Sequence, residues 1–309
     1  MADDRHMNTF VFDTRTATLV LIGTAVCFGL VPLFARELQI AGTESTHIAL
    51  YRFGVSALLM LPFLPRSRDK MREALMLAGA GMLMGLGWVG YLEAVKTAPV
   101  ATAGMVYMTY PLFTLLFAWW LVGQRPTWRA GQAVLLVLGA AALMLGPGEL
   151  SPAQMLALGL ALPAPIAFGL IVVIISACLK RLSTLERMAC GMLGAVAGLA
   201  PVVFAGSTEP LWPAIFSNAW MVFGVAFVTA LVPQLLYTYA APAVGPARSA
   251  AAGSFELPTM LIVGWMAFGE SVGWQELIAA AMVIAAVLLS PPVAPQPQSL
   301  PSGSRSPSS

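Results

Sequence analysis

Aromatic side chains with polar tips occur at helical spacing in two apolar stretches, residues 86–124 and 232–270. Residues three apart on a helix share a face, and a tyrosine deep in an apolar helix needs a partner for its hydroxyl. Such side chains either pack neighbouring helices or form a cavity that stacks a flat ligand and hydrogen-bonds its polar end. The candidates for this substrate path are Trp88, Tyr91, Tyr107, Tyr110, Gln234 and Tyr237.

Two ionisable residues, Arg52 and Glu256, lie inside apolar stretches, where a charge is costly and usually faces protein or water. Arg52 is close enough to the outer end of its predicted helix to snorkel. Glu256 lies about eight residues, or roughly 12 Å, into its predicted helix and precedes Pro258. It either gains and loses a proton or holds the proline kink by a hydrogen bond. His47 and Glu93, near the outer surface, are solvated edge residues or members of a gate.

No arrangement of side chains typical of an enzyme occurs in the sequence. Two histidines, His6 and His47, cannot build a metal site, and the cysteines Cys27, Cys178 and Cys190 have no C-x-x-C spacing. The glycine-rich runs are apolar and lack the Lys-Ser/Thr of a P-loop. We therefore expect no catalytic residues, no metal, no cofactor and no ATP hydrolysis.

The composition indicates a multi-pass protein of the lipid bilayer. The chain has 309 residues, 59% hydrophobic and 10% charged, with a mean hydropathy of +0.82. A soluble domain carries about 25% charged residues. No basic cluster is interleaved with aromatic residues, so a nucleic-acid partner is not expected.

An all-α membrane fold of ten spanning helices follows from apolar runs of about 20 residues. The predicted spans are 16–35, 46–64, 73–94, 100–122, 128–146, 154–178, 186–205, 218–240, 248–268 and 273–290. The chain then divides into an N-terminal segment 1–15, a five-helix repeat 16–146, an outer loop 147–153, a second five-helix repeat 154–290 and a disordered tail 291–309.

The two repeats are visible as matching residues in the two halves. Pro111 and Pro258 each interrupt a long apolar run and are candidates for hinges or for shaping a cavity. The matching pairs are Tyr91 with Tyr237, Ala94 with Ala240, Pro111 with Pro258, Gly123-Gln124 with Gly269-Glu270, and Cys27-Phe-Gly-Leu-Val31 with Ala167-Phe-Gly-Leu-Ile171.

The distribution of positive charge predicts that both termini are cytoplasmic. In that orientation only Arg36 and Lys96 lie in outer loops. The cytoplasmic side carries Arg5, Arg15, Arg66, Arg68, Lys70, Arg72, Arg125, Arg129, Lys180, Arg181, Arg187, Arg248 and Arg305. Since each half has an odd number of helices, the halves are inverted relative to each other, as in many transporters.

These features resemble the EamA-type drug/metabolite transporter superfamily over residues 16–290. The resemblance rests on the duplicated pattern of proline followed by Gly-Gln or Gly-Glu and on Arg52-Phe53 in the second helix. Among its members the chain is most similar to the bacterial aromatic amino-acid exporters. Gln124 replaces the usual acidic residue, and Met192 stands where the second half would repeat Arg-Phe, so these positions have diverged.

The resemblance implies a central cavity lined mainly by the third, fourth, eighth and ninth helices. It also implies export of small metabolites across the inner membrane of a bacterium. We expect a monomeric secondary transporter that moves aromatic or other neutral amino acids by alternating access.

Other functions stay open at the level of sequence. An exporter of drugs or quaternary cations would use Glu256 as a deep carboxylate in an aromatic box. An intramembrane lipid-modifying enzyme needs catalytic groups clustered at one interface, and the sequence offers none. A channel usually builds its pore by oligomerisation, whereas this chain carries its own two-fold repeat. A lipid scramblase is the remaining alternative in that class.

Overall fold

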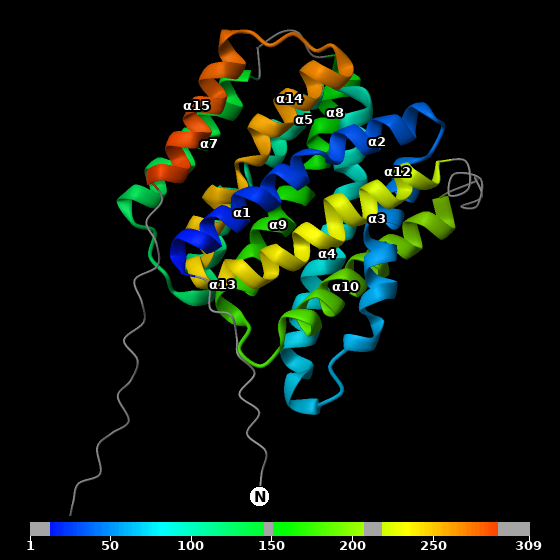
Figure 1. The fold of residues 1–309 in the computed structure, drawn as a ribbon, viewed down its shortest axis with the longest axis vertical. Coiled ribbons are helices and arrows are strands. Elements are labelled where there is room, and N and C mark those ends of the chain that lie inside the picture. Colours follow the sequence, from blue (N-terminus) through cyan, green and yellow to red (C-terminus); the bar gives the residue numbers. More distant parts are fainter. Residues whose placement is uncertain (1–12, 145–150, 207–217, 290–309) are drawn as a thin grey trace, which may run out of the picture.

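The computed structural model describes residues 13–144, 151–206 and 218–289, and these residues form helices and no strand (Figure 1). Most of the predicted N-terminal segment, part of the outer loop 147–153 and the predicted tail lie outside the described residues.

The helices begin and end where polar caps and prolines require. Asp13 caps the first helix by accepting a hydrogen bond from the Thr16 N–H at 3.0 Å, and Ser151 forms a capping box with Gln154. In the first half the elements are α1 (Thr14–Gly29), α2 (Val31–Ile40), α3 (Ser45–Met60), η1 (Leu61–Phe63), η2 (Arg68–Lys70), α4 (Met71–Thr97), α5 (Val100–Tyr107), α6 (Tyr110–Val122) and α7 (Trp128–Met144). In the second half they are α8 (Pro152–Ala161), α9 (Pro163–Val173), η3 (Ile174–Cys178), α10 (Thr184–Gly206), α12 (Ala219–Phe223), η4 (Gly224–Leu231), α13 (Val232–Gly253), α14 (Glu256–Phe268) and α15 (Trp274–Leu289).

Within the described residues, seven helical segments are long and apolar enough to cross a membrane. They are Thr14–Ile40, Ser45–Phe63, Arg68–Thr97, Thr102–Val122, Pro152–Cys178, Thr184–Gly206 and Ala219–Phe268. Trp128–Leu143 and Trp274–Ala286 are shorter apolar helices. Ten crossings require that both shorter helices span and that the 50-residue segment is divided, so the count of ten stays a prediction.

The long segment Ala219–Phe268 differs from the predicted spans 218–240 and 248–268. The chain between them is helical as part of α13, and only Gly245 departs from helical geometry, with φ of 76°. Glycine adopts this left-handed backbone without steric cost. One proline lies on each side of Gly245, Pro242 before it and Pro246 after it. Both lack the N–H donor of a helical residue, which explains a kink at Gly245.

The duplicated proline pattern forms the same broken helix in each half. The break between α5 and α6 precedes Tyr110, and the break between α13 and α14 precedes Glu256. Both α6 and α14 have 13 residues and end at a left-handed glycine, Gly123 or Gly269. Counted back from these glycines, Glu256 and Tyr110 occupy equivalent positions.

Helices from the two halves pack on one another through small residues. In Figure 1, α4 lies beside α10, α1 beside α13 and α7 beside α15. A Cβ atom at Gly81 or Gly85 of α4 would strike the backbone of Gly191 or Ala195 in α10. Small residues allow such close approach of helices in a membrane. The two halves are therefore in close contact along α4 and α10.

Candidate functional site

A cavity lies where the two halves meet, and elements from both halves line it. Its volume is about 40 Å³, which holds a few water molecules and is far below the roughly 300–1,000 Å³ of a small-molecule pocket. The lining includes Arg52, Trp88, Tyr107, Phe168, Gln234 and Glu256. The described conformation is therefore too closed to hold a metabolite.

The aromatic wall of the cavity is one continuous cluster. Trp88 contacts Tyr91 edge to face, with ring centroids 4.8 Å apart, and Tyr107 at 5.7 Å. Phe168 stacks on Tyr107 at 5.7 Å and meets Tyr110 at 4.8 Å. These rings come from α4, α5, α6 and α9, so four helices meet in the cluster.

Arg52 is buried, with 4% of its surface exposed, so the expectation that it snorkels is wrong. Its Nε and Nη2 donate to the carbonyl of Thr229 at 3.3 and 2.8 Å, and its guanidinium stacks on the Trp88 ring at 3.7 Å. Thr229 belongs to η4, and Pro233, four positions later, has no N–H that could compete with Arg52 for this carbonyl. Nη1 of Arg52 has no hydrogen-bond partner.

Glu256 is the first residue of α14 and not a residue of a helix interior, which corrects the predicted depth of eight residues. The reason is the break at Ser254 and Phe255, which ends α13 just before it. Only 1% of Glu256 is exposed, and its Oε1 has no hydrogen-bond partner. Arg248, two turns earlier, points elsewhere, because its Nε donates to Thr18 Oγ1 at 2.9 Å.

The remaining predicted path residues, Tyr91, Tyr110 and Tyr237, are not among the residues that line the cavity, but their rings contact Trp88 or Phe168, which are. Tyr91 directs its hydroxyl to Met260 Sδ at 3.9 Å, and the Tyr110 hydroxyl donates to the Ala250 carbonyl at 2.7 Å. Tyr237 lies 5.9 Å from Phe168 by ring centroids, and its hydroxyl is buried without a partner.

Four predicted hinge or gate residues lie outside the cavity lining. Pro111 is in the first turn of α6 and Pro258 in the first turn of α14. His47 is only 2% exposed, which excludes a solvated edge, and its ring lies 6.4 Å from that of Tyr51. Glu93 is half-exposed and accepts from Ser45 Oγ at 2.9 Å.

Phe28, Phe53 and Phe168 line the cavity but are missing from the predicted path. A signal for two of them was present, since Phe28 and Phe168 are the matching residues of the duplicated Phe-Gly-Leu motif. Phe53 follows Arg52 and lies 6.1 Å from Trp88 by ring centroids.

A polar cluster joins the halves near the ends of α2 and α14. Arg36 forms an ion pair with Glu270 at 2.9 Å and lies over the Phe268 ring at 4.6 Å. The same carboxylate oxygen accepts from the Val100 N–H at the start of α5, at 3.0 Å. Glu270 therefore ties α2 and α5 of the first half to α14 of the second.

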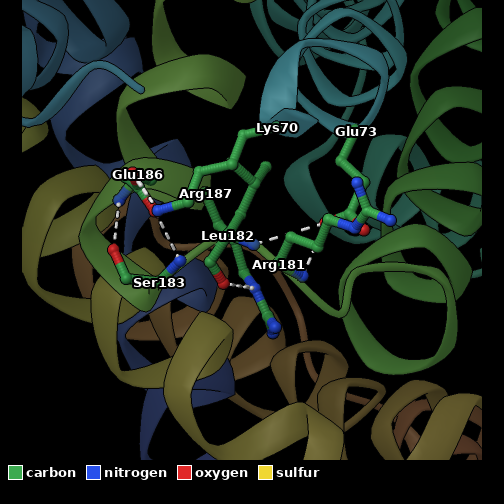
Figure 2. A network of polar contacts seen from close by, with 7 residues as sticks. All are labelled: Lys70, Glu73, Arg181, Leu182, Ser183, Glu186 and Arg187. Carbon is green, nitrogen blue, oxygen red and sulfur yellow. Dashed lines mark hydrogen bonds and ion pairs between the residues drawn. The ribbon is translucent and has the colours of Figure 1, made fainter. Parts of the chain in front are cut away.

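A second polar network ties the start of α4 to the connection between α9 and α10, and Figure 2 shows its side chains. Glu73 Oε2 accepts from the backbone N–H groups of Lys180, Arg181 and Leu182 at 3.0 to 3.3 Å. Glu186 pairs with Lys70 at 2.7 Å. We call this network the α4–α10 latch.

Arg187 forms the floor of the cavity beside this latch. Its Nε, Nη1 and Nη2 donate to the carbonyls of Leu182, Ile175 and Leu179 at 3.0, 3.4 and 3.0 Å. The carbonyls of Ile175 and Leu179 lie at the C-terminal end of η3, where the helix dipole favours a cation.

In the described part of the chain, no group of three or more His, Cys, Asp or Glu side chains is placed so that it could hold a metal ion.

In comparisons with known proteins, both halves of the chain match the same family. The EamA-like transporter family matches residues 15–146 and again residues 155–290. An uncharacterized transporter from Archaeoglobus fulgidus is 24% identical over 276 residues, which cover 89% of this chain and 96% of that protein. A solved crystal structure covers 89% of this chain and 96% of its own with a TM-score of 0.66 at 16% identity, which is a likeness of fold alone.

Partial matches carry a more specific name. An S-adenosylmethionine uptake transporter from Rickettsia prowazekii is 26% identical over 107 residues, which cover 34% of this chain and 36% of that protein. A protein of the same name from Rickettsia bellii is 26% identical over 105 residues, 33% of this chain and 35% of that protein.

Proposed function

We propose that this chain, which belongs to the EamA-like transporter family, exports small metabolites, and specifically aromatic or other neutral amino acids. The observation that carries the proposal is the closed cavity at the junction of the halves, walled by Trp88, Tyr107 and Phe168 and edged by Arg52 and Glu256. Aromatic walls fit an apolar or flat side chain, and the polar groups fit its charged end.

Alternating access is the mechanism that fits this cavity. A volume of about 40 Å³ cannot contain an amino acid, so the halves must separate before a substrate enters. The breaks before Tyr110 and Glu256 are hinge positions in this proposal, because each interrupts its helix beside the cavity. The α4–α10 latch closes one end of the path and the Arg36–Glu270 pair closes the other.

The proposed setting is the inner membrane of a bacterium, with both termini cytoplasmic and one chain forming the whole path. The support is the excess of lysine and arginine in the loops assigned to the cytoplasm. A reporter fused at residue 150 should then be outside, and a cytoplasmic signal there would contradict the ten-helix topology.

A second candidate is transport of a cationic metabolite or drug. Its support is the buried carboxylate of Glu256 among aromatic rings and the S-adenosylmethionine transport named in partial relatives. These relatives are named for uptake, so the direction of transport is part of what must be measured.

Counterflow in proteoliposomes tests the proposal. Purified protein should exchange labelled phenylalanine for unlabelled phenylalanine with saturation and without forming a new chemical species. Trp88→Ala and Tyr107→Ala should lower the apparent affinity several-fold, because each ring contact contributes roughly 0.5–1.5 kcal/mol beyond burial. Unaltered affinity in both variants would mean that the rings only pack helices, and a new product would indicate an enzyme.

A further inference from the structure

An arginine and a glutamate side chain, Arg52 and Glu256, share the central cavity without forming an ion pair with each other. Arg52 and Glu256 both line it and are 4% and 1% exposed. The ion pairs among the described residues join other partners, and Arg52 and Glu256 form none with each other. Nη1 of Arg52 and Oε1 of Glu256 are each buried without a hydrogen-bond partner.

The fold itself keeps the two groups apart. Arg52 is fixed by its bonds to the Thr229 carbonyl and by the Trp88 ring. The backbone of Glu256 is fixed at the start of α14, where its carbonyl lies against Gly29 of α1 so closely that a Cβ there would be 2.9 Å away. A buried charge without a partner is strongly unfavourable, so a site that holds two of them favours a ligand that meets both.

The third charged group of the cavity, Arg187, already has a hydrogen-bond partner on each of its three nitrogens. Arg187 spends Nε, Nη1 and Nη2 on three backbone carbonyls. The other polar groups of the lining belong to neutral side chains, those of Trp88, Tyr107, Gln234 and Thr238. Among the charged residues that line the cavity, Arg52 and Glu256 are therefore the two with a buried side-chain atom that lacks a hydrogen-bond partner.

We propose that this cavity selects zwitterions, with the substrate carboxylate on Arg52, its ammonium group on Glu256 and its side chain against the rings of Tyr107 and Phe168. The inference rests on the proposed transport function and deepens it, because it requires both charges on one substrate. A pure cation would leave Arg52 unpaired beside a second positive charge, and a pure anion would leave Glu256 unpaired. Each loss removes a hydrogen bond to a charged group.

Matched probes that differ by one charged group test this selection. Phenylalanine carries both groups, phenethylamine lacks the carboxylate, and 3-phenylpropanoate lacks the ammonium group. Competition against labelled phenylalanine in counterflow, and thermal stabilisation of the full-length purified chain, give two independent readouts. We expect each incomplete probe to be weaker by roughly 10-fold to 100-fold.

Each of two cavity variants should abolish the preference for one charged group of the substrate. Arg52→Gln should make phenylalanine and phenethylamine similar, whereas Glu256→Gln should make phenylalanine and 3-phenylpropanoate similar. Arg129→Gln, on the exposed start of α7, and Glu37→Gln, on α2, remove the same charges outside the cavity and should leave both ratios unchanged. The ratios of the affinity for phenylalanine to the affinity for each incomplete probe, measured with the wild-type protein, test the inference even if a cavity variant fails to fold.

The outcomes separate this inference from the proposed function. The same three-way comparison is made with other amino acids, their matching amines and their matching acids, so that the side chain does not limit the test. Exchange of amines or acids as readily as of amino acids would overturn zwitterion selection and leave transport standing. Failure of every solute to exchange or to stabilise the protein would overturn both.

Discussion

Phe28 of α1 and Phe168 of α9 meet edge to face, with ring centroids 6.4 Å apart and ring planes at 83°. They are equivalent residues of the duplicated Phe-Gly-Leu motif, so each half contributes the same side chain to this contact. Their surroundings differ, because Phe168 also contacts Tyr107, Tyr110 and Tyr237, whereas Phe28 also contacts Tyr237.

Replacing these two phenylalanines should have unequal effects. Phe168→Leu loses four ring contacts, and Phe28→Leu loses two. Because an aromatic pair contributes roughly 0.5–1.5 kcal/mol, we expect Phe168→Leu to lower the melting temperature and the substrate affinity more. Thermal unfolding in detergent and counterflow measure both. Phe204→Leu is the control, since Phe204 is 76% exposed on α10. Equal losses at Phe28 and Phe168 would contradict this ranking.

The glycines that follow these phenylalanines permit close contact with the opposite broken helix. A Cβ at Gly29 would lie 2.5 Å from Thr259 Cβ of α14, and a Cβ at Gly169 would lie 2.8 Å from Phe113 Cβ of α6. Each alanine substitution should therefore destabilise the protein by roughly 1–3 kcal/mol.

Matched controls exist on neighbouring helical positions. Gly23 of α1 and Gly159 of α8 have nothing within 4 Å of an added Cβ. Alanine there should be neutral or stabilising by up to about 1 kcal/mol, since it favours helix over glycine. Melting temperatures of the four purified variants check this, and loss of stability at Gly23 equal to that at Gly29 would rule out the packing explanation.

Features that depend on local sequence patterns could be predicted from the sequence. The two halves, the apolar helices and the aromatic residues of α4 follow from matching residues and spacing alone. The broken helices were anticipated only as kinks at Pro111 and Pro258, because a proline indicates a missing donor but not where the helix restarts. Because the restart of the helix could not be located, Glu256 was predicted in a helix interior, whereas it is the first residue of α14.

Contacts between distant segments could not be predicted. Burial of Arg52 depends on the Thr229 carbonyl, 177 residues later, and the Glu73 interactions depend on a loop more than 100 residues away. No local pattern specifies which carbonyl or N–H group a charged side chain will reach. Phe168 could have been predicted as a cavity residue, since the duplicated Phe-Gly-Leu motif pairs it with Phe28. Its position at the centre of the aromatic cluster, however, depends on packing between distant helices.

Weakening the α4–α10 latch should open the end of the path near Arg181. Glu73→Gln replaces a carboxylate that accepts three N–H bonds by a neutral amide, and bonds to an ionised acceptor are roughly twice as strong. Cys178 is a half-buried reporter of this opening, because it lines the same surface hollow as Glu73. We expect its labelling by a membrane-impermeant maleimide to rise several-fold.

The labelling experiment needs a background without the other two cysteines, Cys27→Ser and Cys190→Ala. Lys70→Met, which removes the ion pair with Glu186, should act in the same direction as Glu73→Gln. Glu37→Gln, distant from the latch on α2, should not alter labelling. If both latch variants label Cys178 like the parent, the network shapes the loop without gating the path.

Protonation of Glu256 should couple transport to the pH gradient. A proton on this carboxylate removes the negative charge proposed to hold the substrate ammonium group, so acidification should weaken binding. On the more acidic outer side a proton would then displace the substrate and be carried inward in exchange. Glu256→Gln keeps the size and polarity of the side chain but cannot titrate.

The measurement is counterflow and net accumulation in proteoliposomes, with and without an imposed pH gradient. We expect wild-type accumulation to follow the gradient, and we expect Glu256→Gln to retain residual, pH-independent exchange with no gradient-driven accumulation. Glu37→Gln removes a partly exposed carboxylate of α2 outside the cavity lining and should accumulate substrate like the wild type. Should Glu256→Gln exchange more slowly yet keep the wild-type pH dependence, another group carries the proton and Glu256 serves binding alone. Should it match the wild type in both assays, transport follows the substrate gradient without a contribution from this carboxylate.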